Sequence, residues 1–296
     1  MSAALLRVLR VPLTIAAIWW ALSAAVPVAM NQYAPYLVRP GIRCVHDPLV
    51  VGGQLIARNT CLGLADLYHR AFNDLFVESM FRSLALLLGA AVLALTVGTL
   101  LGVAAALLRR RAFASGGILA ATTVLTAVPA FFVAYFLQIV VIIVGATPEG
   151  GKLLPVFGFG YDSHLVLPLL SISLPAIAYT AQLTATRMIE VLNADFITVA
   201  TAKGLRMSWI LGVHVLPHVR PVLLEGLGSG LRVSVASLPI IEYLFNWRGI
   251  GQLALEAVGV HDAAGFIFSA LVLAALFATL SAVADLSRPR GLFQTT

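Results

Sequence analysis

The chain has 296 residues, of which 60% are hydrophobic and only 11% are charged, and its net charge is +6. Soluble domains carry about 25% charged residues, so this composition excludes an ordinary water-soluble protein. Nucleic-acid binding is not expected either, because it needs a clustered basic face, and the sequence indicates none.

Apolar blocks of about twenty or more residues recur along the chain, each long enough to cross a hydrocarbon core of roughly 30 Å as a helix. The sequence therefore predicts an all-α integral membrane protein with six transmembrane helices. The first block exceeds the roughly 7 to 15 apolar residues of a signal peptide, so we expect an uncleaved span, although the small residues at 21–25 also fit a cleavage site. The six predicted spans are Val11–Met30, Ser83–Leu108, Ile118–Val144, His164–Thr186, Val222–Tyr243 and Ala263–Ala284.

Lysine and arginine residues are unevenly divided between the two sides of this predicted membrane protein. Eleven of the 19 lie on the side of the N-terminus, and six lie on the opposite side. Because cytoplasmic loops retain basic residues, we expect both termini in the cytoplasm. The chain then divides into an N-terminal transmembrane helix at 1–30, an extracytoplasmic loop at 31–79, a five-helix core at 80–285 and a cytoplasmic tail at 286–296.

Cys44 and Cys61, the two cysteines of the chain, both fall in the predicted outer loop. An oxidising compartment would favour a disulfide between them. Two unpaired thiols are the alternative, and neither cysteine has the sequence neighbours of a nucleophile or of a metal cluster.

Motifs for catalysis, metal binding and nucleotide binding fail in this sequence. His214 and His218 have the spacing of two metal ligands on a helix, but Pro217 is expected to interrupt the helix between them and no Glu follows His214. Segment 145–153 ends in Gly-Gly-Lys, yet it lacks the first glycine of a phosphate-binding loop and the Ser or Thr after the lysine. We therefore expect no enzymatic activity, no metal and no bound cofactor in this chain.

Arg232 lies near the middle of the fifth predicted span, where a charge is costly in lipid and indicates a function. One interpretation is a solute pathway lined by Arg232, Ser229 and Glu242. The alternatives are an ion pair of Arg232 with Glu225 or Glu242, or burial against a partner subunit. A secondary transporter would need further ion-coupling groups at the membrane midplane, and no chain of carboxylates or histidines accompanies Arg232.

The inner loop between spans four and five is much longer than a simple turn requires. Asp195 is placed to cap a short amphipathic helix there, and Gly204 is placed to end it in the left-handed conformation. Such a helix can dock its apolar face into a groove of a soluble partner, or it can lie on the membrane as an ordinary interfacial helix. The positions that repeat at helical spacing are Phe196, Val199, Ala200 and Lys203.

Residues 195–204, Asp-Phe-Ile-Thr-Val-Ala-Thr-Ala-Lys-Gly, followed by Leu216-Pro217, resemble the cytoplasmic EAA loop of ABC importer permeases. Together with the residues from Met188 onward, they are similar to the B-type permeases of the oligopeptide, dipeptide and nickel group. The resemblance runs from about residue 82 to residue 285. Further agreeing stretches are Val128-Pro129-Ala-Phe131 with Leu154-Pro155-Val-Phe-Gly158, His164-Leu-Val-Leu-Pro168, and Glu242-Tyr-Leu-Phe-Asn-Trp-Arg-Gly-Ile-Gly251.

This resemblance implies that the EAA-type loop at 188–221 carries a coupling helix between spans four and five, which seats in a cleft of a cytoplasmic ATPase. It also implies the partners, namely a second related permease, two ATPase subunits that hold ATP and Mg, and an extracytoplasmic solute-binding protein, assembled in a bacterial plasma membrane. The residues expected to make or shape the ATPase contact are Asp195, Phe196, Val199, Ala200, Ala202, Lys203, Gly204, Leu205 and Pro217.

The implied function is passage of a solute between the two permeases. A di- or oligopeptide is favoured, with nickel or another small solute as the alternative and a self-sufficient secondary transporter as the less favoured class. The outer loop at 31–79 is the expected contact for the binding protein. The sequence departs from the family pattern in this loop, because no Pro-Gly-Asp-Pro run follows the first span. A second departure is Arg248, which stands where proline is usual between the tryptophan and the glycine.

Overall fold

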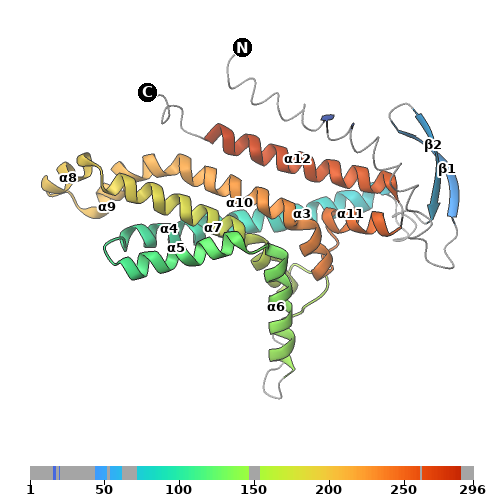
Figure 1. The fold of residues 1–296 in the computed structure, drawn as a ribbon, viewed down its shortest axis with the longest axis horizontal. Coiled ribbons are helices and arrows are strands. Elements are labelled where there is room, and N and C mark those ends of the chain that lie inside the picture. The colour runs from blue at the N-terminus through green and yellow to red at the C-terminus, as the bar shows by residue number, and fades with distance from the viewer. Residues whose placement is uncertain are drawn as a thin grey trace, which may run out of the picture. The chain divides into compact units, whose positions relative to one another are not determined.

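The computed structural model describes residues 72–146, 154–260 and 262–287, the strand residues 44–51 and 54–61, and residues 16, 17 and 20, which are helical. Figure 1 shows an arrangement dominated by helices. The elements are β1 (Cys44–Val51), β2 (Gln54–Cys61), α3 (Phe72–Leu93), the π-helix η1 (Ala94–Gly98), α4 (Thr99–Leu107), α5 (Ala112–Ala127), α6 (Ala130–Gly145), the 3-10 helix η2 (Ser163–Leu165), α7 (Val166–Leu192), α8 (Asp195–Ala202), α9 (Met207–Trp209), the π-helix η3 (Ile210–Val215), α10 (Leu216–Phe245), α11 (Ile250–Gly259) and α12 (Ala263–Ser287).

Four helical stretches are long and apolar enough to cross a membrane, judged by length and composition. Together with the pair α5 and α6, they correspond to five of the six predicted spans. The first predicted span, Val11–Met30, lies outside the described residues apart from residues 16, 17 and 20. The four stretches are Leu75–Leu107, Ser163–Leu192, Met207–Phe245 and Gly265–Ala282.

The third predicted span is not one straight helix. It breaks between α5 and α6, which are bent by 101° at the break. The structure has a fifth candidate span only if these two helices cross the membrane together. Val128 at the break has an extended backbone, with φ −84° and ψ 125°. The following residue is Pro129, which disfavours helical geometry in the residue before it and lacks an N–H group. The helix predicted at 118–144 is therefore broken before Pro129, which the hydropathy pattern did not predict, and its crossing of the membrane stays a prediction.

Two strands lie in the segment predicted as an outer loop. β1 pairs antiparallel with β2 in a register that sets Cys44 opposite Cys61 and Val51 opposite Gln54. The two residues between the strands in the sequence, at 52 and 53, are both glycine, a composition typical of hairpin connections. The membrane-crossing part is helical, as predicted, whereas this hairpin was not predicted.

The chain folds into two compact units, and each unit is built from segments that are distant in the sequence. The first comprises Met1–Leu86, Ala134–Pro168 and Val235–Thr279, and the second comprises Leu87–Val133, Leu169–Ser234 and Leu280–Thr296.

Helix α7 is the packing centre of the second unit. A Cβ atom on Gly98 or Gly102 would lie within 2.8 Å of a backbone carbonyl oxygen of α7, and one on Gly230 would lie 2.3 Å from the Cα of Ala176. The glycines at 98 and 102 and those at 226 and 230 are each four residues apart, so each pair presents one bare stripe to α7. Small residues at this spacing let helix backbones approach closely in lipid, where dispersion replaces the hydrophobic effect.

Candidate functional site

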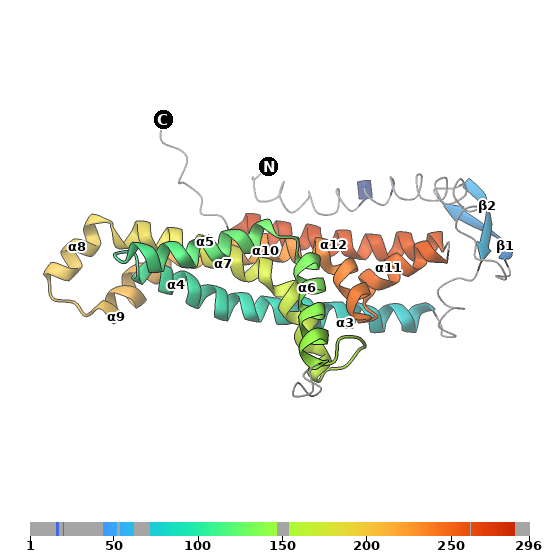
Figure 2. The same cartoon turned by 60° about the horizontal axis from the view of Figure 1, so that its bottom comes forward.

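Helix α8 and its flanking residues 193–215, here called the α8 loop, join the end of α7 to the start of α10 (Figure 2). The residue before α8 is Ala194, whose extended backbone (φ −75°, ψ 149°) marks the start of the helix without a side-chain cap. Asp195 is the first helical residue, so the prediction that Asp195 caps the helix was wrong. Its charge still lies in the first turn, where it interacts favourably with the helix dipole.

Gly204 ends α8 in the left-handed conformation, as the sequence predicted, with φ +75°. The N–H of Gly204 donates to the carbonyl of Thr201 at 2.9 Å, and the N–H of Leu205 donates to the carbonyl of Ala200 at 3.3 Å. These two bonds form a Schellman motif, which satisfies carbonyl groups at the end of the helix. The exit from α8 is therefore sharp and hydrogen-bonded.

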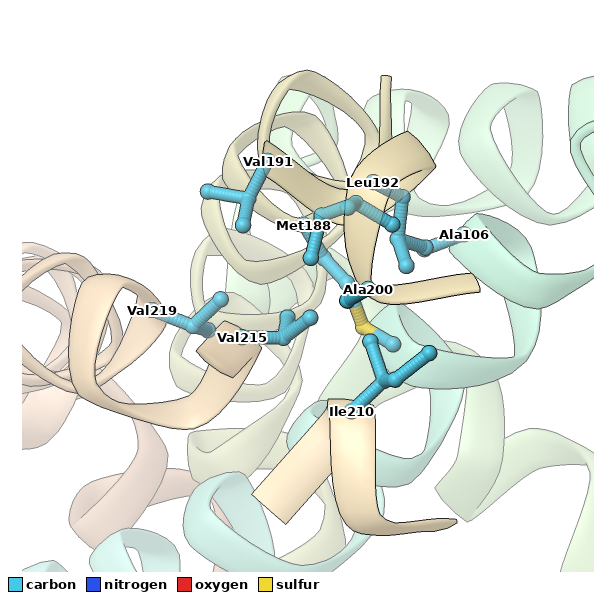
Figure 3. Packing of buried hydrophobic residues seen from close by; sticks show 9 residues of the cluster. Ala106, Met188, Val191, Leu192, Ala200, Ile210, Val215 and Val219 are labelled. Atoms are coloured by element: carbon cyan, nitrogen blue, oxygen red, sulfur yellow. The ribbon is translucent and has the colours of Figure 1, made fainter. Parts of the chain in front are cut away.

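The inner face of the α8 loop is buried in an apolar cluster that joins the loop to three other helices. Figure 3 shows its side chains converging on one another. Because the contributing helices include α7 and α10, any displacement of α8 is transmitted to them through packed side chains. The cluster consists of Ala106 from α4, Met188, Val191 and Leu192 from α7, Ile197 and Ala200 from α8, Ile210 and Val215 from η3, and Val219 from α10.

The π-helix η3 is what allows both of its ends to reach this cluster. Ile210 and Val215 are 1% and 2% exposed although they are five residues apart. In an α-helix, residues five apart point in widely different directions, whereas the i to i+5 bonding of a π-helix brings them onto one face. The helix continues without a break from Met207 to Phe245. The prediction that Pro217 interrupts it between His214 and His218 was therefore wrong.

The outer face of α8 carries exposed apolar side chains. Phe196 is 44% exposed and Val199 is 54% exposed, and the ring of Phe196 lies 5.7 Å from that of His218. Ala200, which was predicted to contact a partner, is instead buried in the cluster. The remaining predicted residues of the loop, Asp195, Ala202, Lys203, Gly204, Leu205 and Pro217, are all exposed.

A shallow, apolar hollow of about 470 Å³ adjoins the end of α8. It is bordered by Trp209, which is 58% exposed, and by Leu205 at 37%. An exposed tryptophan and an exposed leucine thus add to the apolar side chains that the α8 loop presents to its surroundings. The lining residues are Gly204, Leu205, Arg206, Ser208 and Trp209.

Arg232 and Ser229 lie together on α10. The guanidinium Nη2 of Arg232 donates to the hydroxyl of Ser229 at 2.9 Å. Of the pathway residues predicted from sequence, the structure brings these two together.

Glu242, the third residue predicted to line a pathway, has no exposed surface. One carboxylate oxygen accepts a hydrogen bond from the hydroxyl of Ser83, and the other accepts from the N–H groups of Gly251 and Gln252 at 2.8 and 3.0 Å. These N–H groups belong to the first turn of α11, so the carboxylate caps that helix from α10. Glu242 therefore acts as an internal anchor that links α10 to α3 and α11. Because it has no exposed surface, the structure does not support the pathway role predicted for it.

The glycines around Glu242 explain how a carboxylate fits there. A Cβ on Gly249 would lie 2.1 Å from a carboxylate oxygen, and one on Gly251 would lie 2.6 Å from the Cα of Pro239. Sequence reasoning missed this anchor, although the run from Glu242 to Gly251 with its two glycines carries part of the family resemblance. Spacing alone did not indicate that the carboxylate points back at the turn.

Arg82 and Trp247 tie further segments of the first unit to this anchor. The indole of Trp247, which is fully buried, donates to the carbonyl of Arg82 at 3.2 Å, and its ring packs against Phe159. The Arg82 guanidinium lies 4.0 Å from the centroid of the Phe159 ring and pairs with Glu78.

Asn246 and Arg248, on either side of Trp247, have φ values of +53° and +56°. Because proline is restricted to negative φ, this backbone at position 248 differs from one that carries the usual proline.

The cysteine pair is placed by strand register. Cys44 lies directly opposite Cys61, and opposing residues of antiparallel strands have Cα atoms about 4.5 to 5.5 Å apart, within the range that a disulfide spans. The predicted disulfide is compatible with this register and stays a prediction. Within the described residues, no group of three or more His, Cys, Asp or Glu side chains could hold a metal ion.

Comparison with known proteins identifies the family. Residues 98–290 match the family described as binding-protein-dependent transport system inner membrane component. A protein named as a peptide permease in Brucella ovis is 32% identical over 143 residues, which cover 47% of this chain and 45% of that protein. A metal-staphylopine import system permease of Staphylococcus aureus is 28% identical over 153 residues, covering 52% and 48%. A glutathione transport system permease of Escherichia coli is 27% identical over 129 residues, covering 44% and 42%.

The chain thus spans about half the length of the relatives it matches. The family match is more extensive and includes α4 to α12 with the α8 loop, the Arg232 region and the Glu242 anchor. The chain belongs to the family of inner membrane components of binding-protein-dependent transport systems, the permeases of ABC importers.

Proposed function

We propose that this chain is one of two permease subunits of an ATP-driven importer in a bacterial plasma membrane. The two permeases enclose the pathway for a solute that an extracytoplasmic binding protein delivers. ATP and Mg are held by two separate cytoplasmic ATPase subunits, and this chain carries no catalytic group of its own. Its family membership supports the assignment.

The observation that carries the proposal is the two-faced structure of α8. Its inner face, Ile197 and Ala200, is packed into the cluster shared with α7 and α10, while Phe196 and Val199 project outward. An exposed aromatic and an exposed valine on one short helix are suited to a groove on a soluble partner. Burying such a side chain stabilises a complex by about 1 to 2 kcal/mol when half of its surface is removed from water.

Coupling follows from this arrangement. A partner can drive a conformational change only if it contacts the two states differently. When the two ATPases close on ATP, the grooves that hold the α8 helices move, and the shared cluster passes that movement to α7 and α10. The capped exit at Gly204 and the buried face of η3 keep α8 from swinging independently of these helices.

We propose a di- or oligopeptide as the solute. Relatives named for peptide, glutathione and metal-staphylopine transport share between 27% and 32% identity with parts of this chain, and the name of the 32% identical relative supports a peptide. Nickel or another small solute is the alternative.

The test is affinity purification of the tagged chain from its native membrane in mild detergent. We expect a second permease and ATPase subunits to remain bound. The double substitution Phe196→Ser and Val199→Ser should reduce the bound ATPase at least tenfold. Substitution Thr198→Ser, at an exposed polar position on the same helix, is the matched control and should leave binding unchanged.

Two outcomes would contradict the proposal. One is retention of the ATPase by the double variant at the level of the control. The other is recovery of the chain alone, with transport in proteoliposomes driven by an ion gradient without ATP, which would make it a self-sufficient secondary transporter.

A further inference from the structure

Arg232 is a cation in an otherwise uncharged stretch of the α10 span. No other Asp, Glu, Lys or Arg occurs between residues 226 and 241. A charge at this depth is unfavourable against lipid tails, so the side chain must face protein or water. The surrounding contacts distinguish between these two environments.

No contact of Arg232 with the residues that the structure describes neutralises its charge. Among the residues that the structure describes, its guanidinium donates to the hydroxyl of Ser229, which carries no charge. The acidic residues of the same helix are Glu225, seven residues before it, and Glu242, ten residues after it. Glu242 is fully buried and its oxygens are held by Ser83 and by the first turn of α11. A guanidinium has five N–H donors, so most of its hydrogen-bonding capacity is open to a ligand.

Arg232 also points away from α7, one of the two helices that the glycines of α10 approach; the other is α12, where a Cβ on Gly228, four residues before Arg232, would lie 2.7 Å from the Cβ of Ala284. Gly230 approaches the backbone of Ala176, and the hydroxyl of Ser234 donates to the carbonyl of Ile172 at 2.7 Å, so both residues face α7. At about 100° per residue, Arg232 lies two residues and roughly 160° from both of them around the helix. The neighbouring Val233 is 37% exposed.

We infer that Arg232 faces the water-filled solute pathway and binds a carboxylate of the passing solute. The planar guanidinium matches a carboxylate with two parallel hydrogen bonds, which a lysine or a hydroxyl cannot reproduce. The inference rests on the proposed function and narrows it, because it requires a solute with an anionic group. Peptides meet this requirement through their C-terminal carboxylate, whereas a bare divalent cation such as nickel would be repelled.

The first test measures the electrostatic potential beside Arg232 in the complete importer. Val233→Cys is treated with an anionic sulfonatoethyl or a cationic trimethylammonioethyl methanethiosulfonate, and labelling of residue 233 is read by peptide mass spectrometry, which separates it from Cys44 and Cys61. Rates are normalised to those of a small free thiol. We expect the normalised anion-to-cation ratio to exceed one, and to fall by roughly tenfold when Arg232→Gln is added. Arg232→Lys should keep the ratio high.

The matched control is Leu100→Cys on α4, another exposed position in a predicted span, 69% exposed and without a neighbouring charge in the sequence. We expect lipid to shield it from both reagents. Failure of Val233→Cys to react in the presence and absence of ATP, or a ratio that Arg232→Gln leaves unchanged, would overturn the inference.

The second test addresses the carboxylate. Trialanine at tens of millimolar should slow the labelling of Val233→Cys, and trialanine amide, which lacks the terminal carboxylate, should slow it less. Equal effects of the two peptides, including no effect of either, would overturn the carboxylate assignment. Failure of the proposed function appears elsewhere, as loss of ATPase association in the purification described above, so the two failures are distinguishable.

Discussion

Two glycines in the α8 loop differ in backbone conformation but not in the space around them. A Cβ added to Gly204 or to Gly212 would meet no atom within 4 Å. Gly204 has φ +75°, whereas Gly212 lies in η3 and is not among the described glycines with positive φ. The pair therefore separates the cost of a left-handed backbone from the cost of a steric clash.

We expect Gly204→Ala to weaken ATPase association roughly fivefold, equivalent to about 1 kcal/mol, because a residue with a Cβ is strained in the left-handed region. Gly212→Ala should have little effect. The measurement is titration of purified ATPase against the permease in detergent, with membrane insertion checked by expression level. Equal behaviour of the two variants would rule out the proposed role of the Gly204 turn.

Glu242 is a second residue whose environment fixes its role. Its carboxylate holds Ser83 of α3 and the first turn of α11, and the glycines at 249 and 251 make room for it. Removing a buried acceptor leaves donors unsatisfied, and each such group costs about 1 to 3 kcal/mol.

We expect Glu242→Ala to lower the stability of the detergent-solubilised protein by about 3 kcal/mol or more, since three donors lose their acceptor. Glu242→Gln should be milder, because its amide oxygen can still accept from the N–H groups of Gly251 and Gln252. Melting temperatures from fluorescence-detected size-exclusion chromatography would show the difference. A Gln variant as unstable as the Ala variant would contradict this account.

Among the elements, η3 determines how α8 is rotated about the helix axis relative to α10. Its π-helical bonding accommodates one residue more than an α-helix would need between Ile210 and Val215. Removal of one residue would place these two side chains four apart, which is again one face of a helix. The extra residue is thus absorbed locally, without rotating the elements on either side.

Deletion of Gly212 is accordingly expected to convert η3 into α-helix and to leave ATPase association within about threefold of the unmodified chain. Deletion of Val222, within the regular part of α10, should abolish association, because it rotates everything before it by about 100° relative to the rest of the helix. Both variants are measured by co-purification. If the Gly212 deletion is as damaging as the Val222 deletion, the π-helix is not a one-residue insertion.

At the scale of the whole molecule, the hairpin bears on orientation in the membrane. β1 and β2 lie in the segment that the distribution of basic residues predicts to be outside. Disulfides form and persist in oxidising compartments and are rare in the cytosol. A bridged cysteine pair would therefore place this segment outside and support cytoplasmic termini.

We expect Cys44 and Cys61 to be linked in the native membrane. After denaturation without reductant, a polyethylene-glycol maleimide should add to neither cysteine, and after reduction it should add to both, with a matching gel shift. The bridge would stabilise the hairpin by about 3 kcal/mol, given a loop of this size. The single variant Cys44→Ser is the control and should leave Cys61 reactive without reductant; modification of both cysteines in the unreduced protein would disprove the bridge.

The distribution of apolar and basic residues was enough to predict a helical membrane protein and the position of five helical stretches, because the length of an apolar block reflects the thickness of the bilayer. Gly204 was also predictable, since a glycine after an amphipathic segment is a common helix end. Pro129 itself could have predicted the break. The residues around it are apolar, however, and hydropathy carries no information about backbone geometry.

Only the tertiary structure decided which side of each helix is buried and what each polar group contacts. It assigned Glu242 to the start of α11, turned Ala200 inward and Phe196 outward, and set Arg232 opposite the face that packs on α7. In a chain that is 60% hydrophobic, nearly every helix face is apolar, so periodicity barely distinguishes lipid from protein. That distinction comes from close approach at small residues and from hydrogen bonds between distant segments, neither of which has a local signature in the sequence.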